Sequence, residues 1–484
     1  MRFTDLAAEH AARLDSLARE PQWEALISSG AVDAARESMM VPSRPVNVFK
    51  LPVEQLQRIN EPSVRALIDA GERNEDRLLD ALGTWPEKWP ADVPVRLSFV
   101  GVNLDFACDM SPRCIYCNQR SVERRMTPQH WLALVRSVIP EEGEGPYLFI
   151  TGGEPLLEGE ALWGPQGIIR AATAAGAACN VNTNGLRLTP EVALQLVSSG
   201  LSRLHVSLDS HLPEVQDAIH GCSGRWATVV RGIHNLQLAK RLLGAEHPVI
   251  HINSVLTRLN APGFPGFLRF LLGMKLAASG PEARDFDLHL IPVGGDKNQH
   301  LRLTAEEYER FFTETWDAAN VVWEEFQRDW EVPDDQRGPI HAKVPYMSPF
   351  HRVRHSGDLC AWAEKAATGR PAALSATRRC YVGPTQAFIL PDGAQYWCGG
   401  HATCRPEPVG NVLEASVQEN IARKVGQMRD LPGTQCVSCP GATQAINQSV
   451  ENALRELIRS WLNPPSDEQQ PRAAATEPDA SAFE

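Results

Sequence analysis

The chain has 484 residues, of which 43% are hydrophobic and 22% charged, and this composition is typical of a soluble globular protein with a large core. Its net charge of −12 excludes broad nucleic-acid binding, because no basic excess exists to neutralise phosphates. The sequence contains no apolar run of the ~18 residues that a membrane helix needs, and no secretory signal at its start. We therefore expect a cytoplasmic protein with no nucleic-acid or membrane partner.

Residues 1–94 are predicted to form a mostly helical N-terminal region. Apolar residues recur at near-helical spacing over residues 3–17, Pro21 ends that segment, and a second helical stretch is expected over residues 64–82. The proline-rich segment 85–94 cannot continue a helix and marks a boundary. Without a recognisable motif, packing against the rest of the chain is the simplest role for this region.

From residue 95 the pattern changes to a regular alternation of strands and helices. Strands are expected at residues 95–103, 147–151, 178–182, 203–209, 249–256 and 286–293. Thr-Pro pairs at 127–128 and 189–190 supply an N-cap followed by a helix-starting proline. Six strand–helix units in series imply a parallel sheet that closes partly into a barrel. The predicted fold is α/β: a partial (β/α)6 TIM-like barrel over residues 95–324.

The rest of the chain is expected to form a smaller unit. Residues 325–375 are irregular and are interpreted as a connector. A hairpin with an Asp392-Gly393 turn and an amphipathic final helix then belong to a small cysteine-rich C-terminal domain, residues 376–463. The tail, residues 464–484, has a disordered composition.

Three cysteines, Cys108, Cys114 and Cys117, lie within ten positions on a loop that leaves the first barrel strand. Thiols this close in a cytoplasmic protein favour a soft-metal site over disulfides. The C-x5-C-x2-C spacing alone suits three of four zinc ligands as well as it suits a [4Fe–4S] cluster. A cluster held by three cysteines would leave one iron open to another ligand.

Polar groups occur where the next three strands end, which is where barrels of this kind place their sites. A Gly-Gly-Glu segment suits an amino group, while amide, hydroxyl and carboxylate groups suit ribose hydroxyls and a carboxylate. Each group alone has a simpler interpretation as a turn or a helix cap. The residues are Gly152, Gly153 and Glu154 after the second strand, Asn182 and Asn184 after the third, Ser207 and Asp209 after the fourth, and Tyr116, whose ring suits a purine.

With these motifs, residues 95–300 resemble the radical S-adenosylmethionine (SAM) superfamily. The resemblance depends on the cysteine loop with its aromatic residue, Gly-Gly-Glu-Pro at 152–155, Thr-Asn-Gly at 183–185 and Ser-Leu-Asp at 207–209. It implies that the three cysteines hold a [4Fe–4S] cluster and that SAM binds its open iron. The Gly-Gly-Glu segment would meet the methionyl amino group, and the polar groups of the third and fourth strands would surround the ribose and carboxylate. The commonest family spacing has three residues between the first two cysteines, and this chain has five.

The resemblance also implies an enzymatic activity. Reductive cleavage of SAM would give a 5′-deoxyadenosyl radical that abstracts hydrogen from a peptide or a small natural-product substrate. The implied electron donor is a flavodoxin or a ferredoxin.

A second cysteine group lies near the C-terminus. Cys380 and Cys398 bracket the hairpin, and Cys436 and Cys439 form a later C-x2-C pair. Four thiols in this pattern suit a structural zinc site. Beside the barrel they resemble the SPASM/twitch extension of the superfamily, which implies a second, auxiliary [4Fe–4S] cluster that assists oxidation or bond formation. Cys404 could replace one of the four ligands or be free.

Two alternatives stay open. In the first, the enzyme is an epimerase in which a cysteine returns a hydrogen atom to the substrate. The candidate donors are Cys222 and Cys404, although the simpler interpretation of Cys222 is a small buried hydrophobic residue. In the second, the chain is a non-catalytic binding protein stabilised by two zinc sites, which leaves the strand-end motifs unexplained.

Overall fold

The computed structural model describes residues 2–119, 122–140, 144–279, 286–294, 296–335, 379–404, 407–431 and 441–463, with isolated positions between 337 and 367. Most of the predicted connector and all of the tail at 464–484 lie outside the described residues.

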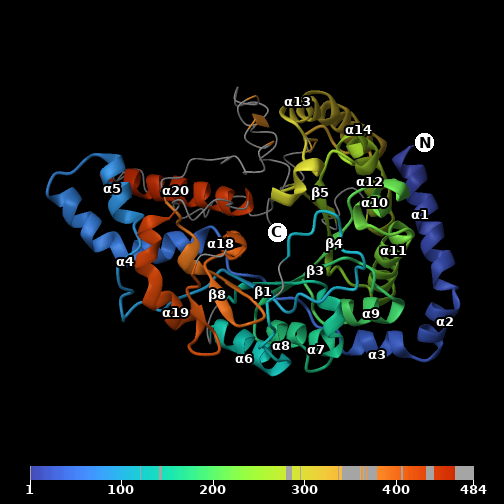
Figure 1. Ribbon diagram of the computed structural model, residues 1–484, viewed down its shortest axis with the longest axis horizontal. Coiled ribbons are helices and arrows are strands. Elements are labelled where there is room, and N and C mark those ends of the chain that lie inside the picture. The colour runs from blue at the N-terminus through green and yellow to red at the C-terminus, as the bar shows by residue number, and fades with distance from the viewer. Residues whose placement is uncertain are drawn as a thin grey trace.

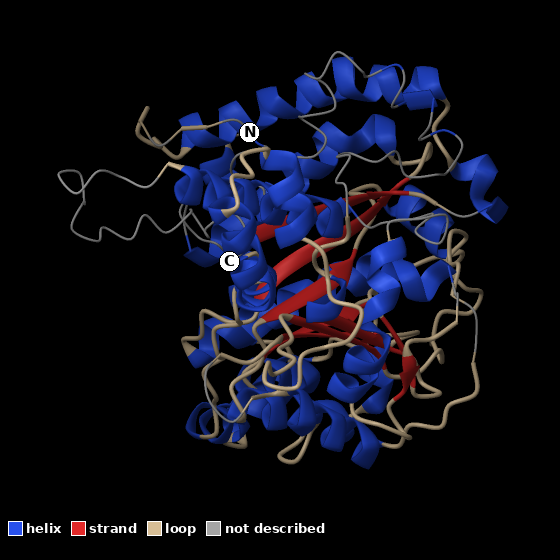
Figure 2. Cartoon of the chain, turned by 90° about the vertical axis from the view of Figure 1, so that its left-hand side faces the viewer, coloured by secondary structure: helices blue, strands red, loops and turns tan. Residues whose placement is uncertain are grey.

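The described strands form one nine-stranded sheet in the order β6-β5-β4-β3-β2-β1-β7-β8-β9 (Figure 1). Strands β1 to β6 pair in parallel in chain order, which confirms the predicted α/β fold with its parallel sheet. Figure 2 shows these strands as a twisted sheet enclosed by helices. The strands are β1 Phe99–Asn103, β2 Tyr147–Thr151, β3 Ala178–Thr183, β4 Arg203–Ser207, β5 Val249–Leu256 and β6 Phe286–Pro292.

The helices that follow these strands begin where the sequence indicates. Thr127, Thr189 and Thr304 each accept a hydrogen bond from the backbone N–H three residues ahead, as N-caps do. The main helices are α6 Pro128–Val138, α7 Glu160–Trp163, α8 Ile168–Ala174, α9 Pro190–Ser198, α10 Pro213–His220, α11 Arg225–Leu243, α12 Phe264–Ser279, α13 Ala305–Arg310 and α14 Trp316–Asp329.

The N-terminal helices divide between two sides of the molecule (Figure 1). Helices α1 Phe3–Ala18, α2 Pro21–Ser28 and α3 Ala31–Glu37 pack against α9, α11 and α12. Helices α4 Lys50–Asp69 and α5 Glu75–Leu82 pack instead against the final helix, α20 Gly441–Leu462. The single helical stretch predicted over residues 64–82 is wrong, because α4 ends at Asp69 and the Asn74 side chain caps a new helix.

The predicted C-terminal hairpin is confirmed, and it continues the barrel sheet. Strand β7 Gln386–Ile389 pairs in parallel with β1, and β8 Ala394–Tyr396 returns antiparallel to it. Strand β9 Gly410–Asn411 and helices α18 Gly399–Cys404 and α19 Val417–Lys424 complete the described part of this region. The domain boundaries drawn from the sequence stay predictions.

The two faces of the sheet differ in burial. Directly paired residues of parallel strands point to the same side, so the registers assign each side chain to a face. The outer face is apolar and buried under the helices, as at Ile150, Val181 and Val206. The opposite, inner face carries polar and aromatic side chains, and many of them are half-buried. This inner face leads to the strand ends at which the motifs occur.

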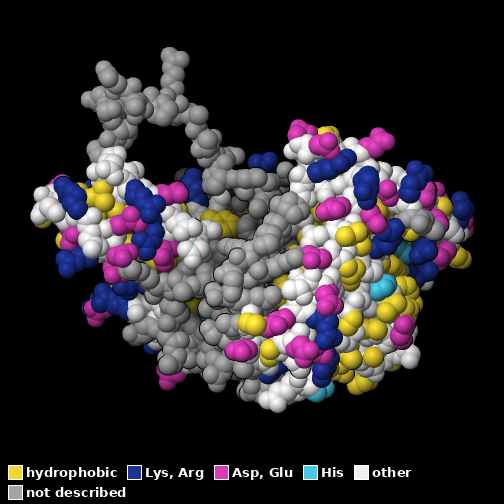
Figure 3. Space-filling model, turned by 90° about the horizontal axis from the view of Figure 1, so that it is seen from above, with side chains coloured by type: hydrophobic (Ala, Val, Ile, Leu, Met, Phe, Trp, Pro, Cys, Tyr) yellow, Lys and Arg dark blue, Asp and Glu magenta, His cyan; other side chains and the backbone are white. Residues whose placement is uncertain are grey.

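No helix within the described ranges is both long and apolar enough to cross a membrane. On the face seen from above, the Lys and Arg side chains of the described residues are interspersed with Asp and Glu (Figure 3).

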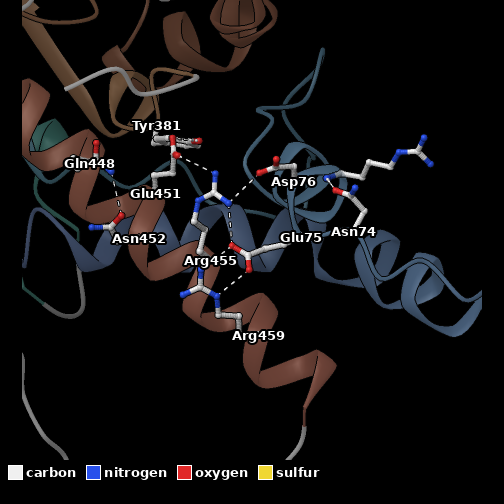
Figure 4. Close-up of polar contacts among 10 residues, drawn as sticks. Asn74, Glu75, Asp76, Tyr381, Gln448, Glu451, Asn452, Arg455 and Arg459 are labelled. Carbon is white, nitrogen blue, oxygen red and sulfur yellow. Dashed lines mark hydrogen bonds and ion pairs between the residues drawn. The ribbon is translucent and has the colours of Figure 1, made fainter.

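A polar cluster joins α5 to α20 and to the residue after Cys380 (Figure 4). Arg455 binds Glu75 at 2.9 Å and Asp76 at 3.1 Å, and it lies 3.4 Å from Glu451. The Tyr381 hydroxyl donates to Glu451 at 2.9 Å. Burial and the Glu451 charge raise the pKa of Tyr381, so its hydroxyl stays a donor. The cluster therefore connects α5, α20 and Tyr381.

Tyr381→Phe should lower the free energy of unfolding by about 1–3 kcal/mol, because it removes a donor to the buried Glu451 carboxylate. Asn452→Ala, at an exposed position of the same helix, should change it by less than about 0.5 kcal/mol. Urea unfolding of both variants checks the difference. Equal stability of Tyr381→Phe and the wild type would contradict it.

Candidate active site

Cys108, Cys114 and Cys117 lie half-buried on the loop after β1. Burial, then the charges of Asp209 and of the other two thiols, raise the pKa of Cys114 to about 12. A thiolate at Cys114 therefore needs a nearby positive charge, which bound metal supplies. The three thiols thus fit a cation-bearing group.

The five residues between Cys108 and Cys114 are anchored to neighbouring elements. The Asp109 carboxylate accepts from Asn184 Nδ2 at 2.7 Å and from Arg187 Nε at 2.8 Å, both beyond the end of β3. Met110 is buried. The longer spacing is therefore part of an ordered contact with the third strand end.

The two glycines after β2 allow the cysteine loop to lie directly on them. Gly153 N–H donates to Asp105 O at 2.7 Å, and Glu154 N–H donates to Ala107 O at 2.8 Å. A Cβ at Gly153 would overlap the Ala107 carbonyl, and Gly152 has a φ of 153°. These N–H groups hold the chain just before Cys108. The sequence interpretation missed this structural use of the glycines.

The Glu154 carboxylate links the ends of β2 and β3. It is buried and accepts hydrogen bonds from Thr183 Oγ1 at 2.8 Å, Asn184 N at 2.7 Å and Leu156 N at 2.9 Å. Burial raises its pKa to about 7, although these hydrogen bonds act in the opposite direction. The Gly152 carbonyl accepts from Gln119 Nε2.

Tyr116 and Asp209 meet across the site. The Tyr116 hydroxyl donates to Asp209 Oδ2 at 3.2 Å, and Val255 N–H donates to Asp209 Oδ1 at 2.6 Å. The buried His220 Nε2 lies 3.4 Å from the same carboxylate. Asp209 therefore joins the cysteine loop to the ends of β4 and β5.

Asn182 and Ser207 lie half-buried at the ends of β3 and β4. Asn182 Oδ1 accepts from Asn253 Nδ2 at 2.8 Å, and Asn253 Oδ1 lies 3.1 Å from His205 Nδ1. The sequence interpretation missed Asn253 and His205. Their signal is the polar–apolar–polar alternation N-V-N, H-V-S and H-I-N at 180–182, 205–207 and 251–253.

Cys380 and Cys398 are half-buried and form no disulfide. Cys398 Sγ accepts from His401 N–H at 3.4 Å, as a ligating thiolate can. Cys436 and Cys439 lie outside the described residues, as does the side chain of Cys404. The four-thiol site is therefore described only at its two hairpin positions.

An apolar cluster connects the two cysteine regions. Phe106 precedes Cys108 by two positions, and Tyr396 precedes Cys398 by two. The hairpin thus packs directly on the loop that carries the first cysteines. The buried members of the cluster are Phe106, Leu390, Ala394, Tyr396 and Ala402.

Residues 124–126 form ion pairs and a hydrogen bond with the start of the cysteine loop, the segment after β2 and the hairpin turn. Arg124 Nη1 binds Asp105 at 2.9 Å and Glu158 at 2.7 Å. The N–H of Met126 donates to Pro391 O, in the turn of the hairpin, at 2.9 Å.

Cys222 lies in the turn between α10 and α11, half-buried. The neighbouring Gly221 faces the Pro112 ring, and Ile115 N–H donates to Ile219 O at 3.0 Å. Cys222 is therefore near the cysteine loop.

No three His, Cys, Asp or Glu side chains among the described residues surround a point where one metal ion could bind. In a four-iron cluster the ligating cysteines bind separate irons, so its thiols need not converge on one point. The three thiols, their shared electrostatics and the ordered loop fit such a group.

Comparison with known proteins agrees with this arrangement. A sequence profile described as "Radical SAM superfamily" matches residues 107–245. The AdoMet-dependent heme synthase of Methanosarcina barkeri is 36% identical over 301 residues, which are 61% of this chain and 74% of that protein. The chain belongs to the radical SAM superfamily. Membership makes the protein an enzyme and implies a [4Fe–4S] cluster and SAM.

Two further similarities are of lower identity. The mycofactocin maturase MftC of Mycolicibacterium smegmatis is 25% identical over 359 residues, or 72% of this radical SAM chain and 76% of MftC. The solved structure of native anSMEcpe with bound AdoMet and Cp18Cys peptide covers 76% of this chain and 99% of its own, at 14% identity and a TM-score of 0.48.

Gly153→Ala should displace the loop before Cys108, because the new Cβ meets the Ala107 carbonyl. We expect a loss of stability of about 2 kcal/mol or more and reduced iron binding. Gly263→Ala is the matched control, since its Cβ would meet only the His211 ring at 3.5 Å. Thermal unfolding and iron per chain after reconstitution are the measurements. Wild-type iron content in Gly153→Ala would contradict the proposed role of the glycine.

Burial lowers the pKa of His205 from 6.5 to about 3. A lowered folded-state pKa contributes stability that is present above pH 6.5 and is lost as the pH falls towards 3. His205→Gln should therefore flatten the stability profile between pH 6.5 and 4, by up to about 1.4 kcal/mol per pH unit. Asn452→Ala, at an exposed position that does not titrate, is the control and should leave the slope unchanged. Chemical unfolding at several pH values provides the test, and an unchanged slope in His205→Gln would contradict it.

Proposed function

We propose that the chain is a radical SAM enzyme that abstracts hydrogen from a peptide or a small natural-product substrate, assisted by an auxiliary cluster. One observation supports the proposal most: hydrogen bonds connect the cysteine loop to the ends of β2, β3 and β4. The residues that make them are Gly153, Glu154, Asn184 and Asp209. When bound, the cluster and SAM supply a 5′-deoxyadenosyl radical.

The chain's own residues have positioning roles in this proposal. Cys108, Cys114 and Cys117 hold the cluster. Glu154 and the glycines before it keep the loop against β2, while Asn184 fixes Asp109 within the loop. Residues at the ends of β3 and β4 surround SAM.

The auxiliary cluster is proposed at Cys380, Cys398, Cys436 and Cys439. Its support is the placement of the first two: they bracket a hairpin that pairs with β1 and packs on the cysteine loop. A cluster there would lie beside the same strand that leads to the first site.

The substrate class draws on the relatives. One is named a mycofactocin maturase and another an AdoMet-dependent heme synthase, so the names of similar proteins indicate more than one kind of product. We therefore keep the proposal at a peptide or small natural product.

Anaerobic reconstitution should give two clusters, or about eight iron atoms per chain, and reductant-dependent formation of 5′-deoxyadenosine from SAM. Cys114→Ala should abolish SAM cleavage, whereas Cys436→Ala should retain part of it with about half the iron. Cys360→Ala, at an exposed cysteine assigned to neither site, should behave as the wild type.

Zinc in place of iron, with no SAM cleavage, would overturn the proposal. Equal and total loss of cleavage in Cys114→Ala and Cys436→Ala would overturn the division between the two sites. Solvent deuterium in the product would favour the epimerase alternative, in which a thiol returns the hydrogen atom.

A further inference from the structure

One half of the inner face is lined by aromatic rings. Phe99 stacks with Tyr147 and Phe149 at centroid distances of 6.1 and 6.0 Å. Phe388, on the neighbouring β7, covers Gly101 on the same face. All four rings are half-buried, so part of the surface of each residue is accessible. These rings form what we call the aromatic wall.

The other half of the inner face, on β3, β4 and β5, is an amide and imidazole wall. Asn180 Nδ2 lies 2.6 Å from His205 Nε2, and Asn253 contacts both His205 and Asn182. The His205 and His251 rings stack at 4.5 Å. Phe149 meets His205 edge-on at 5.9 Å, so the two walls are continuous.

This surface carries neutral imidazoles and the Arg203 cation. Burial lowers the pKa of His205 to about 3 and of His289, on β6, to about 4, so these imidazoles are neutral near pH 7. Arg203 is at the opposite end of β4 from the cysteine loop, with its guanidinium 5.9 Å from the Tyr147 ring centre. Arg203 is in register with Asn180, so this cation lies beside the amide wall.

Two buried acceptors on the inner face lack a donor. Asn103 Oδ1 and Asn180 Oδ1 have no hydrogen-bond partner among the described residues, and the two side chains are 5% and 1% exposed. A buried acceptor without a donor costs stability, and a ligand O–H or N–H that reaches it removes this cost. Asn103 ends β1, next to the cysteine loop, and Asn180 lies deeper on β3.

We propose that the inner face binds part of the substrate, and that this part is an aromatic ring bearing a hydrogen-bond donor, such as a phenol or an indole. The ring would lie on the aromatic wall, and its O–H or N–H would face the amide wall. This inference rests on the proposed function, because it takes the inner face to be the substrate side.

The test uses two fluorinated probes and ¹⁹F NMR on the full chain, without SAM or reductant: 4-fluorophenol and fluorobenzene. We expect 4-fluorophenol to bind about five times more tightly than fluorobenzene or better. Phe149→Leu should weaken both probes. Asn180→Ala should remove the preference for the phenol while fluorobenzene still binds. Asn452→Ala, on the surface of α20, is the control and should match the wild type.

Equal affinity for the two probes in the wild-type protein would overturn the proposal without any variant. A phenol preference that survives Asn180→Ala, or binding that Phe149→Leu leaves unchanged, would place the ligand elsewhere and would also overturn it. Since no probe requires a cluster, failure here is distinguishable from failure of SAM cleavage, which would overturn the proposed function instead.

Discussion

Two backbone hydrogen bonds between the cysteine loop and the end of β2 support the rest of the site. They run from Gly153 and Glu154 to the carbonyls of Asp105 and Ala107, and they require a residue without a side chain at position 153. The Glu154 carboxylate then extends the connection to β3. Because each strand end is tied to its neighbour, the loop that carries three thiols has one position relative to the sheet.

The C-terminal hairpin continues the same construction on the other side of β1. It adds strands to the sheet, contributes Tyr396 to the apolar cluster that contains Phe106, and receives a hydrogen bond from Met126 at Pro391. Its two described cysteines are therefore placed by contacts with the loop that holds the first three. The two cysteine groups share one framework, although more than 260 positions separate Cys117 from Cys380.

Much of the fold could be predicted from local signals. The strand at 249–256 is a β-rich run with clear limits, and the Thr-Pro pairs start helices where expected. The strand-end groups follow from the rule that parallel strands end at one edge. The contacts of Asn253 with Asn182 and His205 could not be predicted, because they depend on the register of three strands. The pairing of β7 with β1 has no local signal either, since any exposed edge could accept that strand.

That pairing has a consequence for biosynthesis. Ser98, beside β1, donates to the carbonyl of Thr385, a residue 287 positions later. At a synthesis rate of roughly 5–20 residues per second, β1 would keep an open edge for about 15 to 60 s after it leaves the ribosome. During this interval Phe106, two positions before Cys108, lacks the apolar contacts that the hairpin supplies. The growing chain therefore exposes an apolar patch and an unpaired strand edge together, and the synthesis of the hairpin closes both at once.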